Sequence, residues 1–405
     1  MNSVPHVQKA PNPKHFWTLV LCGTLLVITT TGLARMGYGA VLPYMQKGLH
    51  LTISQTGLLG TIMFLGYLLT VGLSGVLAVR WGAKLVLITG SAAVVVSMLG
   101  LVWSSSFWAI GLFMFVIGAG SSLVFTPLMS LMIGWFPQQR GKVLGILLSG
   151  AGIGMLLSGF LIPVIIRVFP HDGWHAVWLC FGIISLVVLV LSLFVLKNPA
   201  SARQTVSEED KPQWLKNKEL TLIAVLYFLI GMAYLIPNLY QSSYMLEAGI
   251  SSSTTGLIYA FAGVFSIIGG PVWGSISDKA GVQQTFMLAW IFAVLGDLVP
   301  IVMDNVWGFA ISSIIWGSSI GGLVTLIQVK ASQQVPSKYV PSGIGFISVF
   351  YAVGQMLGPA LSGWMIEHMG GFAAAYGLGA VVYVLGFVLN SRGKVVSMQS
   401  ERSSL

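Results

Sequence analysis

Long apolar segments recur along the chain and constrain its fold more than any other feature. Each is long enough, at about 1.5 Å per helical residue, to cross about 30 Å of hydrocarbon. With 56% hydrophobic and only 8% charged residues, the composition excludes a soluble globule, which carries about 25% charged residues. We therefore expect an all-α polytopic membrane protein with twelve transmembrane helices. The expected spans are residues 16–44, 54–78, 83–103, 107–135, 143–167, 174–196, 220–246, 253–277, 283–303, 306–330, 340–366 and 372–391.

The only long polar segment between spans predicts the domain organisation. It follows the sixth span and contains proline, serine and charges of both signs, which is typical of a linker. The first span is too long to be the apolar core of a signal peptide, so we expect it to be retained. The predicted units are an N-terminal six-helix bundle at 1–196, a cytoplasmic linker at 197–219, a C-terminal six-helix bundle at 220–391 and a cytoplasmic tail at 392–405.

The loop charges predict an orientation. If the N-terminus is cytoplasmic, almost every loop lysine and arginine falls on the cytoplasmic side, and only Lys47 and Arg167 lie on the other. This asymmetry predicts a multi-pass protein of the cytoplasmic membrane with both termini inside. The net charge of +9 therefore marks topology in a lipid bilayer, and we expect no nucleic-acid partner.

The two halves of the sequence resemble each other when one is shifted by 199 residues. Ser54–Leu58 (SQTGL) then aligns with Ser253–Leu257 (STTGL), and Gly75–Gly82 (GVLAVRWG) aligns with Gly274–Gly281 (GSISDKAG). Glycine coincidences alone are weak evidence in so glycine-rich a chain. Matching segments at the same point of each half, however, are typical of transporters built from parallel repeats. We expect two pseudo-symmetric six-helix halves.

A glycine-framed basic turn between the second and third spans, together with two six-helix halves, resembles the major facilitator superfamily over nearly the whole chain. Further family-like segments are Trp135–Ile146, Gly173–Trp178 and Gly354–Gly363. The closest similarity is to a poorly characterised bacterial subgroup, and a weaker one is to monocarboxylate and oxalate porters. The resemblance implies a secondary transporter that binds substrate between its halves and alternates its access. The turn motif is present as Gly75, Leu77, Arg80, Gly82 and Lys84, with Val79 in place of the family's aspartate, and as Gly274, Asp278, Lys279 and Gly281 in the second half.

In the family this turn is a gate element, and we assign Asp278, Arg140 and Arg80 to gating. Asp278 is expected to pair with Arg140 or Lys142 and latch the cytoplasmic side. Because Val79 cannot pair in this way, the corresponding latch beside Arg80 is doubtful. The alternative is that these are solvated loop charges, since an exposed ion pair is worth only about 0–1 kcal/mol.

Arg35 lies inside the first apolar span. Placing a guanidinium in hydrocarbon costs at least about 2.5–3.5 kcal/mol, so it must face protein or a water-filled cavity. The functional interpretation is an anion-binding site. The alternative is a structural arginine that packs on a neighbouring carbonyl or extends toward the membrane surface.

Polar residues outline a candidate substrate site around Arg35. Thr31, Arg35 and Tyr38 share a face of span one by i, i+4, i+7 spacing. Under the 199-residue shift, Arg35 aligns with Tyr234 of span seven, where Pro237 would interrupt the helix. The remaining predicted substrate-binding residues are Asn238, Gln241, Tyr259 and Gln355. Tyr67 and Tyr351 are among the residues that could complete the cavity.

A lone intramembrane cation favours a small organic anion as substrate. The alternative is an exporter of neutral or amphipathic compounds that bind an aromatic cavity. Asp297 is the candidate for proton coupling, and the alternative is an acid at a helix end. Lys330 is expected either to line the inner vestibule or to extend to the membrane surface. The chain has only two cysteines and no CxxC motif, so we expect no metal and no cofactor. We expect no enzymatic activity and a monomer.

Overall fold

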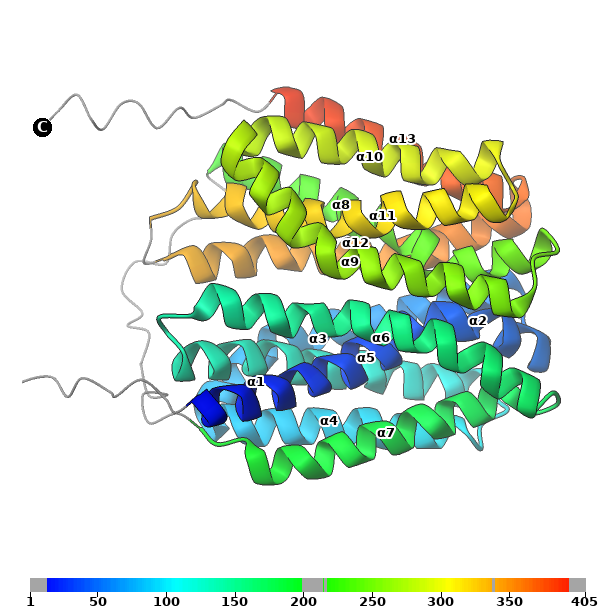
Figure 1. The fold of residues 1–405 in the computed structure, drawn as a ribbon, viewed down its shortest axis with the longest axis horizontal. Coiled ribbons are helices and arrows are strands. Elements are labelled where there is room, and N and C mark those ends of the chain that lie inside the picture. Colours follow the sequence, from blue (N-terminus) through cyan, green and yellow to red (C-terminus); the bar gives the residue numbers. More distant parts are fainter. Residues whose placement is uncertain (1–12, 199–213, 215–216, 337–338, 393–405) are drawn as a thin grey trace, which may run out of the picture.

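The computed structural model describes residues 13–198, 214, 217–336 and 339–392 (Figure 1). Across these residues every regular element is helical, and twelve helices are long and apolar enough to cross a membrane. The predicted all-α fold with twelve transmembrane helices is therefore confirmed. The elements are α1 (Pro13–Val27), η1 (Ile28–Met36), α2 (Gly37–Gly48), α3 (Ile53–Trp81), α4 (Ala83–Leu101), α5 (Phe107–Trp135), α6 (Arg140–Val168), α7 (Gly173–Val195), α8 (Lys218–Glu247), α9 (Ser252–Ala280), α10 (Val282–Val302), α11 (Val306–Ser332), α12 (Val340–His368) and α13 (Gly371–Arg392).

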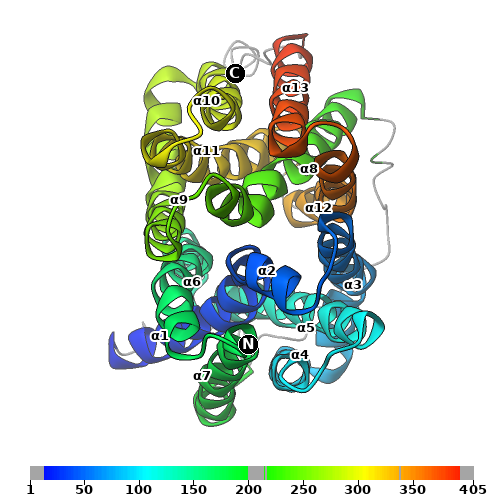
Figure 2. The same cartoon turned by 90° about the vertical axis from the view of Figure 1, so that its right-hand side faces the viewer.

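The helices form two groups that follow the chain order. Figure 2 shows α1 to α7 in the lower part of the view and α8 to α13 in the upper part, with α2 and α8 near the centre. Below, these groups are called the N-terminal and C-terminal halves. Most of the predicted linker at 197–219, and all but the first residue of the predicted tail at 392–405, lie outside the described residues.

Three pairs of helices confirm the repeat. The helices α3, α4 and α5 begin at residues 53, 83 and 107, and α9, α10 and α11 begin at 252, 282 and 306. Each pair therefore differs by the predicted 199 residues. The glycine turns also match, because Gly82 and Gly281 have φ values of 89° and 87°, a left-handed conformation that other residues rarely adopt.

The same equivalence holds at the start of α3 and α9. The side chain of Thr52 accepts a hydrogen bond from the backbone N–H of Gln55, and the side chain of Ser251 accepts one from Thr254. Such caps satisfy backbone donors that the first turn of a helix leaves free. The second membrane-spanning helix of each half, α3 and α9, thus begins with the same kind of side-chain cap.

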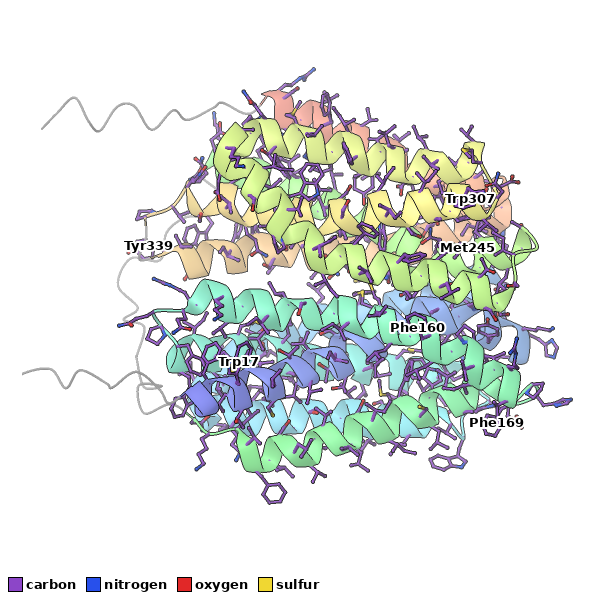
Figure 3. All side chains as sticks on the ribbon, in the orientation of Figure 1. Trp17, Phe160, Phe169, Met245, Trp307 and Tyr339 are labelled. Carbon is purple, nitrogen blue, oxygen red and sulfur yellow. The ribbon has the colours of Figure 1, made fainter. Side chains whose placement is uncertain are left out.

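Both described chain ends lie at one end of the bundle, on the left in Figure 1, which we call the terminal end; the opposite end is the distal end. Figure 3 shows aromatic side chains at both ends, with Trp17 and Tyr339 at the terminal end and Phe169 and Trp307 at the distal end. Trp17 and Trp307 are 47% and 74% exposed. Aromatic residues gather in this way where membrane proteins meet the lipid headgroups.

The halves touch along α6 and α9, but only on the distal side. Three glycines with seven-residue spacing share one face of α6. A Cβ added to Gly159 would collide with the backbone of Gly256, and one added to Gly152 would lie 2.7 Å from the carbonyl oxygen of Gly263. A Cβ added to Gly145, toward the terminal end, would meet nothing within 4 Å. The two helices therefore diverge toward the terminal end.

The contact between α3 and α12 likewise occurs on the distal side and is lost toward the terminal end. The Thr61 hydroxyl donates to the carbonyl oxygen of Met356 at 2.7 Å and accepts from the amide of Ala360 at 3.1 Å. Nearer the distal end, the amide of Ser54 donates to the Glu367 carboxylate at 2.9 Å. Toward the terminal end of α3, Cβ atoms added at Gly72 and Gly75 would meet nothing within 4 Å. The described halves are thus closed at the distal end and separate toward the terminal end.

Candidate functional site

The segment that carries Arg35 is a π-helix. Residues Ile28–Met36 form the element η1, in which the amide of Gly37 bonds to the carbonyl of Gly32, five residues earlier, and all nine residues of η1 are buried. Turns of π-helix are rare and frequently mark functional sites. The apolar periodicity of the span gives no sign of this segment. Because its last residue, Met36, contacts Tyr259 of the C-terminal half, η1 is the candidate location of the functional site.

The guanidinium of Arg35 lies between two aromatic rings of α3. Its carbon Cζ is 4.9 Å from the centroid of Phe64 and 4.2 Å from that of Tyr67. Arg35 is only 5% exposed and lies near the middle of its span. Its Nε has no hydrogen-bond partner, and no carboxylate in the described part of the chain pairs with it. Arg35 is therefore a buried cation that the rings stabilise by cation–π contacts and that no anion of the described residues neutralises.

Tyrosines of the C-terminal half complete this region. Tyr234 on α8 and Tyr351 on α12 lie close enough to Arg35 to interact with it electrostatically. Their rings stack at 5.8 Å, and Tyr227 stacks on Tyr351 at 4.2 Å. Gln355 donates to the Tyr234 hydroxyl at 2.6 Å, while its own carbonyl oxygen is buried without a partner. The structure thus brings the predicted residues Arg35, Tyr234 and Gln355 together where the halves meet.

Other predicted site residues lie in the distal contact between the halves. Tyr259 donates to the carbonyl oxygen of Met36 at 2.5 Å, which joins α9 to the end of η1, and Asn238 donates to Tyr259 at 3.4 Å. A Cβ on Gly39 would collide with the backbone of Asn238. Tyr38 donates to the carbonyl oxygen of Thr56 at 2.8 Å, within its own half. These residues close the distal side of the Arg35 region.

Two further predicted residues are separate from this cluster. Gln241 donates to Ser313 at 2.9 Å inside the C-terminal half. Thr31 is 7% exposed, and its hydroxyl has no hydrogen-bond partner among the described residues. Neither forms a hydrogen bond with Arg35 in the described part of the chain.

The predicted gating residues lie at the terminal end. Asp278, Arg140 and Arg80 are all exposed. No ion pair among the described residues joins Asp278 to Arg140 or Lys142. In this conformation the two halves are separated at the terminal end, so the latch remains a prediction for the state in which that end is closed.

Lys330 is held inside the C-terminal half. Its Nζ donates to Gln283 at 2.8 Å and to Asn390 at 2.7 Å, and it lies 5.7 Å from the ring of Phe286. Lys330 is 7% exposed. These neutral amides satisfy its charge between α10, α11 and α13, so in this state the amine takes no part in the Arg35 region.

Asp297 is fully buried in α10, and neither of its carboxyl oxygens has a hydrogen-bond partner in the described residues. It lies five residues before the end of α10. Full burial distinguishes it from an acid at the membrane surface. The arrangement around it is taken up below.

Two residues of the region were not predicted from the sequence. Phe64 is an ordinary aromatic residue in an apolar helix, and nothing in the sequence marks it. Tyr227 carried a usable signal, because it lies seven residues before Tyr234 and therefore on the same face of α8.

The fold and this site define a twelve-helix membrane transporter made of two halves with a central cationic site. The profile of the family described as "Uncharacterised MFS-type transporter YbfB" matches residues 27–391. The chain therefore belongs to the major facilitator superfamily, as its sequence motifs predicted.

Individual relatives are distant. The chain is 25% identical to the "Hexuronate transporter" of Bacillus subtilis over 404 residues, covering 91% of this chain and 94% of that protein. It is 25% identical to the "Agnestins efflux protein AgnL12" of Paecilomyces divaricatus over 329 residues, covering 80% and 74%. It is 23% identical to the "Monocarboxylate transporter 12-B" of Danio rerio, covering 68% of this chain but under two thirds of that protein, 64%.

A solved structure shows the same fold. The nucleoside transporter NupG, in a mutant form, superimposes with a TM-score of 0.78 over 92% of this chain and 99% of that one, at 12% sequence identity.

Proposed function

We propose that this transporter moves a small, carboxylate-like organic anion across the cytoplasmic membrane by alternating access. One observation carries the proposal: the Arg35 guanidinium is 5% exposed, and no carboxylate in the described residues pairs with it. A buried charge without a counter-ion costs several kcal/mol. A bound carboxylate would supply that counter-ion and would accept two parallel hydrogen bonds from the planar guanidinium. Relatives named as monocarboxylate and hexuronate transporters support an anionic substrate.

The proposed orientation places the terminal end in the cytoplasm. Its support is the concentration of loop lysines and arginines on that side. The described conformation, closed at the distal end, then corresponds to an inward-facing state. Substrate reaches the Arg35 region from the cytoplasm in this state and from outside after the halves rock.

Substitution of Arg35 tests the anion site. Purified protein is screened by thermal shift against carboxylates, amino acids, sugars and hydrophobic cations, and affinity for the best ligand is then measured. Arg35→Lys keeps the charge but not the planar pair of donors, so binding should weaken partially. Arg35→Gln should weaken carboxylate binding at least about tenfold, because each charge-assisted hydrogen bond is worth about 1.5–3 kcal/mol.

Lys142→Gln is the matched control. Lys142 also lies over aromatic rings, 5.4 Å from Phe16 and 5.7 Å from Trp17, but it is exposed at the terminal end. Its loss should leave affinity unchanged. All three variants should insert: Arg35→Gln removes an intramembrane charge and so relieves an insertion cost, Arg35→Lys keeps the charge of the wild type, and Lys142 is exposed at the terminal end.

The second candidate function is export of neutral or amphipathic compounds. The stacked rings of Tyr227, Tyr351 and Tyr234 favour it, because they form an aromatic wall that needs no charge on the ligand. A relative named as an efflux protein is consistent with it. Strong binding of a neutral or cationic compound that survives Arg35→Gln would establish this candidate and refute the anion site.

A further inference from the structure

Asp297 packs directly on the backbone of α13. A Cβ added to Gly379 would collide with Oδ2 of Asp297, so only glycine leaves room for the carboxyl group. Asp297 is 0% exposed, and both of its oxygens lack a hydrogen-bond partner. An isolated ionised carboxylate in such surroundings is so costly that the group takes up a proton instead. We therefore expect a neutral carboxylic acid at this position inside the C-terminal half.

Two tyrosines flank this acid on the same helix. Tyr376, Gly379 and Tyr383 follow i, i+3, i+7 spacing and share one face of α13. Both tyrosines lie close enough to Asp297 to interact with it electrostatically. The Tyr376 hydroxyl is buried and, like the carboxyl group, has no hydrogen-bond partner. Two buried, unpartnered groups that can each hold and release a proton thus lie at the same face of α13.

The other elements described in this region contribute apolar or neutral side chains. From α8, the apolar Ile236 lies beside Gly379. From α11, Trp316 packs on the adjacent Gly296, and Ser312 donates to the carbonyl oxygen of Gly296 at 2.6 Å. The described titratable groups that interact with Asp297 are Tyr376 and Tyr383.

Tyr376 leads toward the distal surface. Its ring packs edge to face on Tyr244 at 5.6 Å. Tyr244 is half-buried and interacts electrostatically with Glu247 and Asp304, which are both exposed at the distal end. Tyr376 and Tyr244 thus extend from the side of the buried acid toward the carboxylates of the distal end.

Tyr383 leads in the other direction. It packs against Trp290 at 6.0 Å and lies close enough to Tyr234 to interact electrostatically. Tyr234 in turn interacts with Arg35. The acid is thus connected on one side to the distal surface and on the other to the anion site.

We propose that Asp297 is a proton-binding site and that Tyr376 and Tyr383 connect it to the distal surface and to the Arg35 region. A proton that leaves the carboxyl group binds a tyrosine oxygen while that hydroxyl releases its own proton onward, so each tyrosine ends unchanged. The inference deepens the proposed function and rests on it, because one proton carried with one anion makes transport electroneutral.

Infrared difference spectroscopy of the purified full-length protein tests this site with the proton as its own probe. Wild-type protein should show a carboxylic-acid carbonyl band that exchanges on transfer to D₂O and disappears at high pH. Asp297→Asn, which has the shape of the neutral acid and should fold, should lack that band. Tyr376→Phe should keep the band but slow its exchange at least about tenfold.

Tyr240→Phe is the control, since that hydroxyl is buried in the same half but donates to the carbonyl oxygen of Pro359 at 2.8 Å. It should leave the exchange rate unchanged. A band that persists in Asp297→Asn would overturn the proposal. So would a band that neither exchanges nor titrates in the wild type, or an exchange rate that Tyr376→Phe does not alter. These outcomes are independent of anion affinity, so failure of the Arg35 test is distinguishable from failure here.

Discussion

Thr61 shows how a single side chain can join the two halves. Its hydroxyl lies between the carbonyl of Met356 and the amide of Ala360, which an uninterrupted α-helix would pair with each other. Pro359, just before Ala360, lacks an amide hydrogen and disturbs the helix at this point. The Thr61 hydroxyl of the N-terminal half therefore forms hydrogen bonds with the α12 backbone at a point where that helix is disturbed. These hydrogen bonds must break when the distal end opens.

Removal of that hydroxyl should loosen the distal closure. Thr61→Val preserves shape but loses both hydrogen bonds, each worth about 0.5–1.5 kcal/mol. A cysteine at Thr255, 4% exposed, in a background without Cys22 and Cys180, should then react with a membrane-impermeant maleimide about 5- to 160-fold faster, because the two bonds together are worth about 1–3 kcal/mol. Thr70→Val is the control, because Thr70 bonds within the N-terminal half, to Gly66 at 2.7 Å. Equal effects of the two substitutions would show that Thr61 has no special role.

The sequence draws attention to residues whose chemistry is unusual and gives no sign of those whose chemistry is ordinary. Arg35 and Asp297 were recognisable because a charge in an apolar span has few acceptable explanations. Thr61 was not, because threonine is common in these helices and its partner is the backbone of a segment almost 300 residues away, at Met356. The contact depends on how the two halves dock, and local sequence does not encode that.

Among the elements, α6 and α9 form one of the two most extensive contacts between the halves. Their glycines permit backbones to approach in lipid, where packing rather than hydrophobicity drives association. Gly159 has no free space, because an added Cβ would collide with the backbone of Gly256, whereas Gly145 on the same face has open space around it. The local sequence does not show which of these glycines are in contact.

Leucine at these two positions should therefore have very different effects on stability. Gly159→Leu should lower the free energy of unfolding of this state by about 1–3 kcal/mol, since backbone cannot move aside as a flexible side chain can. Gly145→Leu should change it by less than about 0.5 kcal/mol. Thermal denaturation in detergent measures both. Equal destabilisation would mean that the halves do not diverge along α6.

The element that the sequence did not predict is η1. Apolar periodicity places a helix across residues 16–44, and the first span runs from Phe16 to Gly48. A π-helical turn leaves that average pattern unchanged, so no count of apolar residues detects it. Its stability comes from tertiary contacts, such as the backbone approach of Gly32 to Gly154.

At the scale of the whole molecule, the two halves are in contact at the distal end and separated at the terminal end. Alternating access also requires a state in which the terminal end is closed and the distal end is open. The antiparallel register of α6 and α9 pairs Gly159 with Gly256 and Gly152 with Gly263. Continued toward the terminal end, it pairs Gly145 with residue 270. It also places Arg140 opposite Ser275, within one helical turn of Asp278. Closure along this register would bring the predicted latch together.

A cross-linking experiment tests the latch in that closed state. Cysteines at Gly145 and Gly270, in a background without Cys22 and Cys180, should form a disulfide only when the terminal end closes. Asp278→Asn removes the predicted partner of Arg140 and should slow cross-linking about two- to fivefold, because an exposed ion pair is worth at most about 1 kcal/mol. Asp278→Glu, which keeps the charge, should restore the rate, and Glu247→Gln at the distal end should have no effect. Raised salt should reproduce the slowing in the wild type and leave Asp278→Asn unaffected, because screening weakens exposed charge pairs. A rate that is the same in all variants would reduce Asp278 to a solvated loop charge.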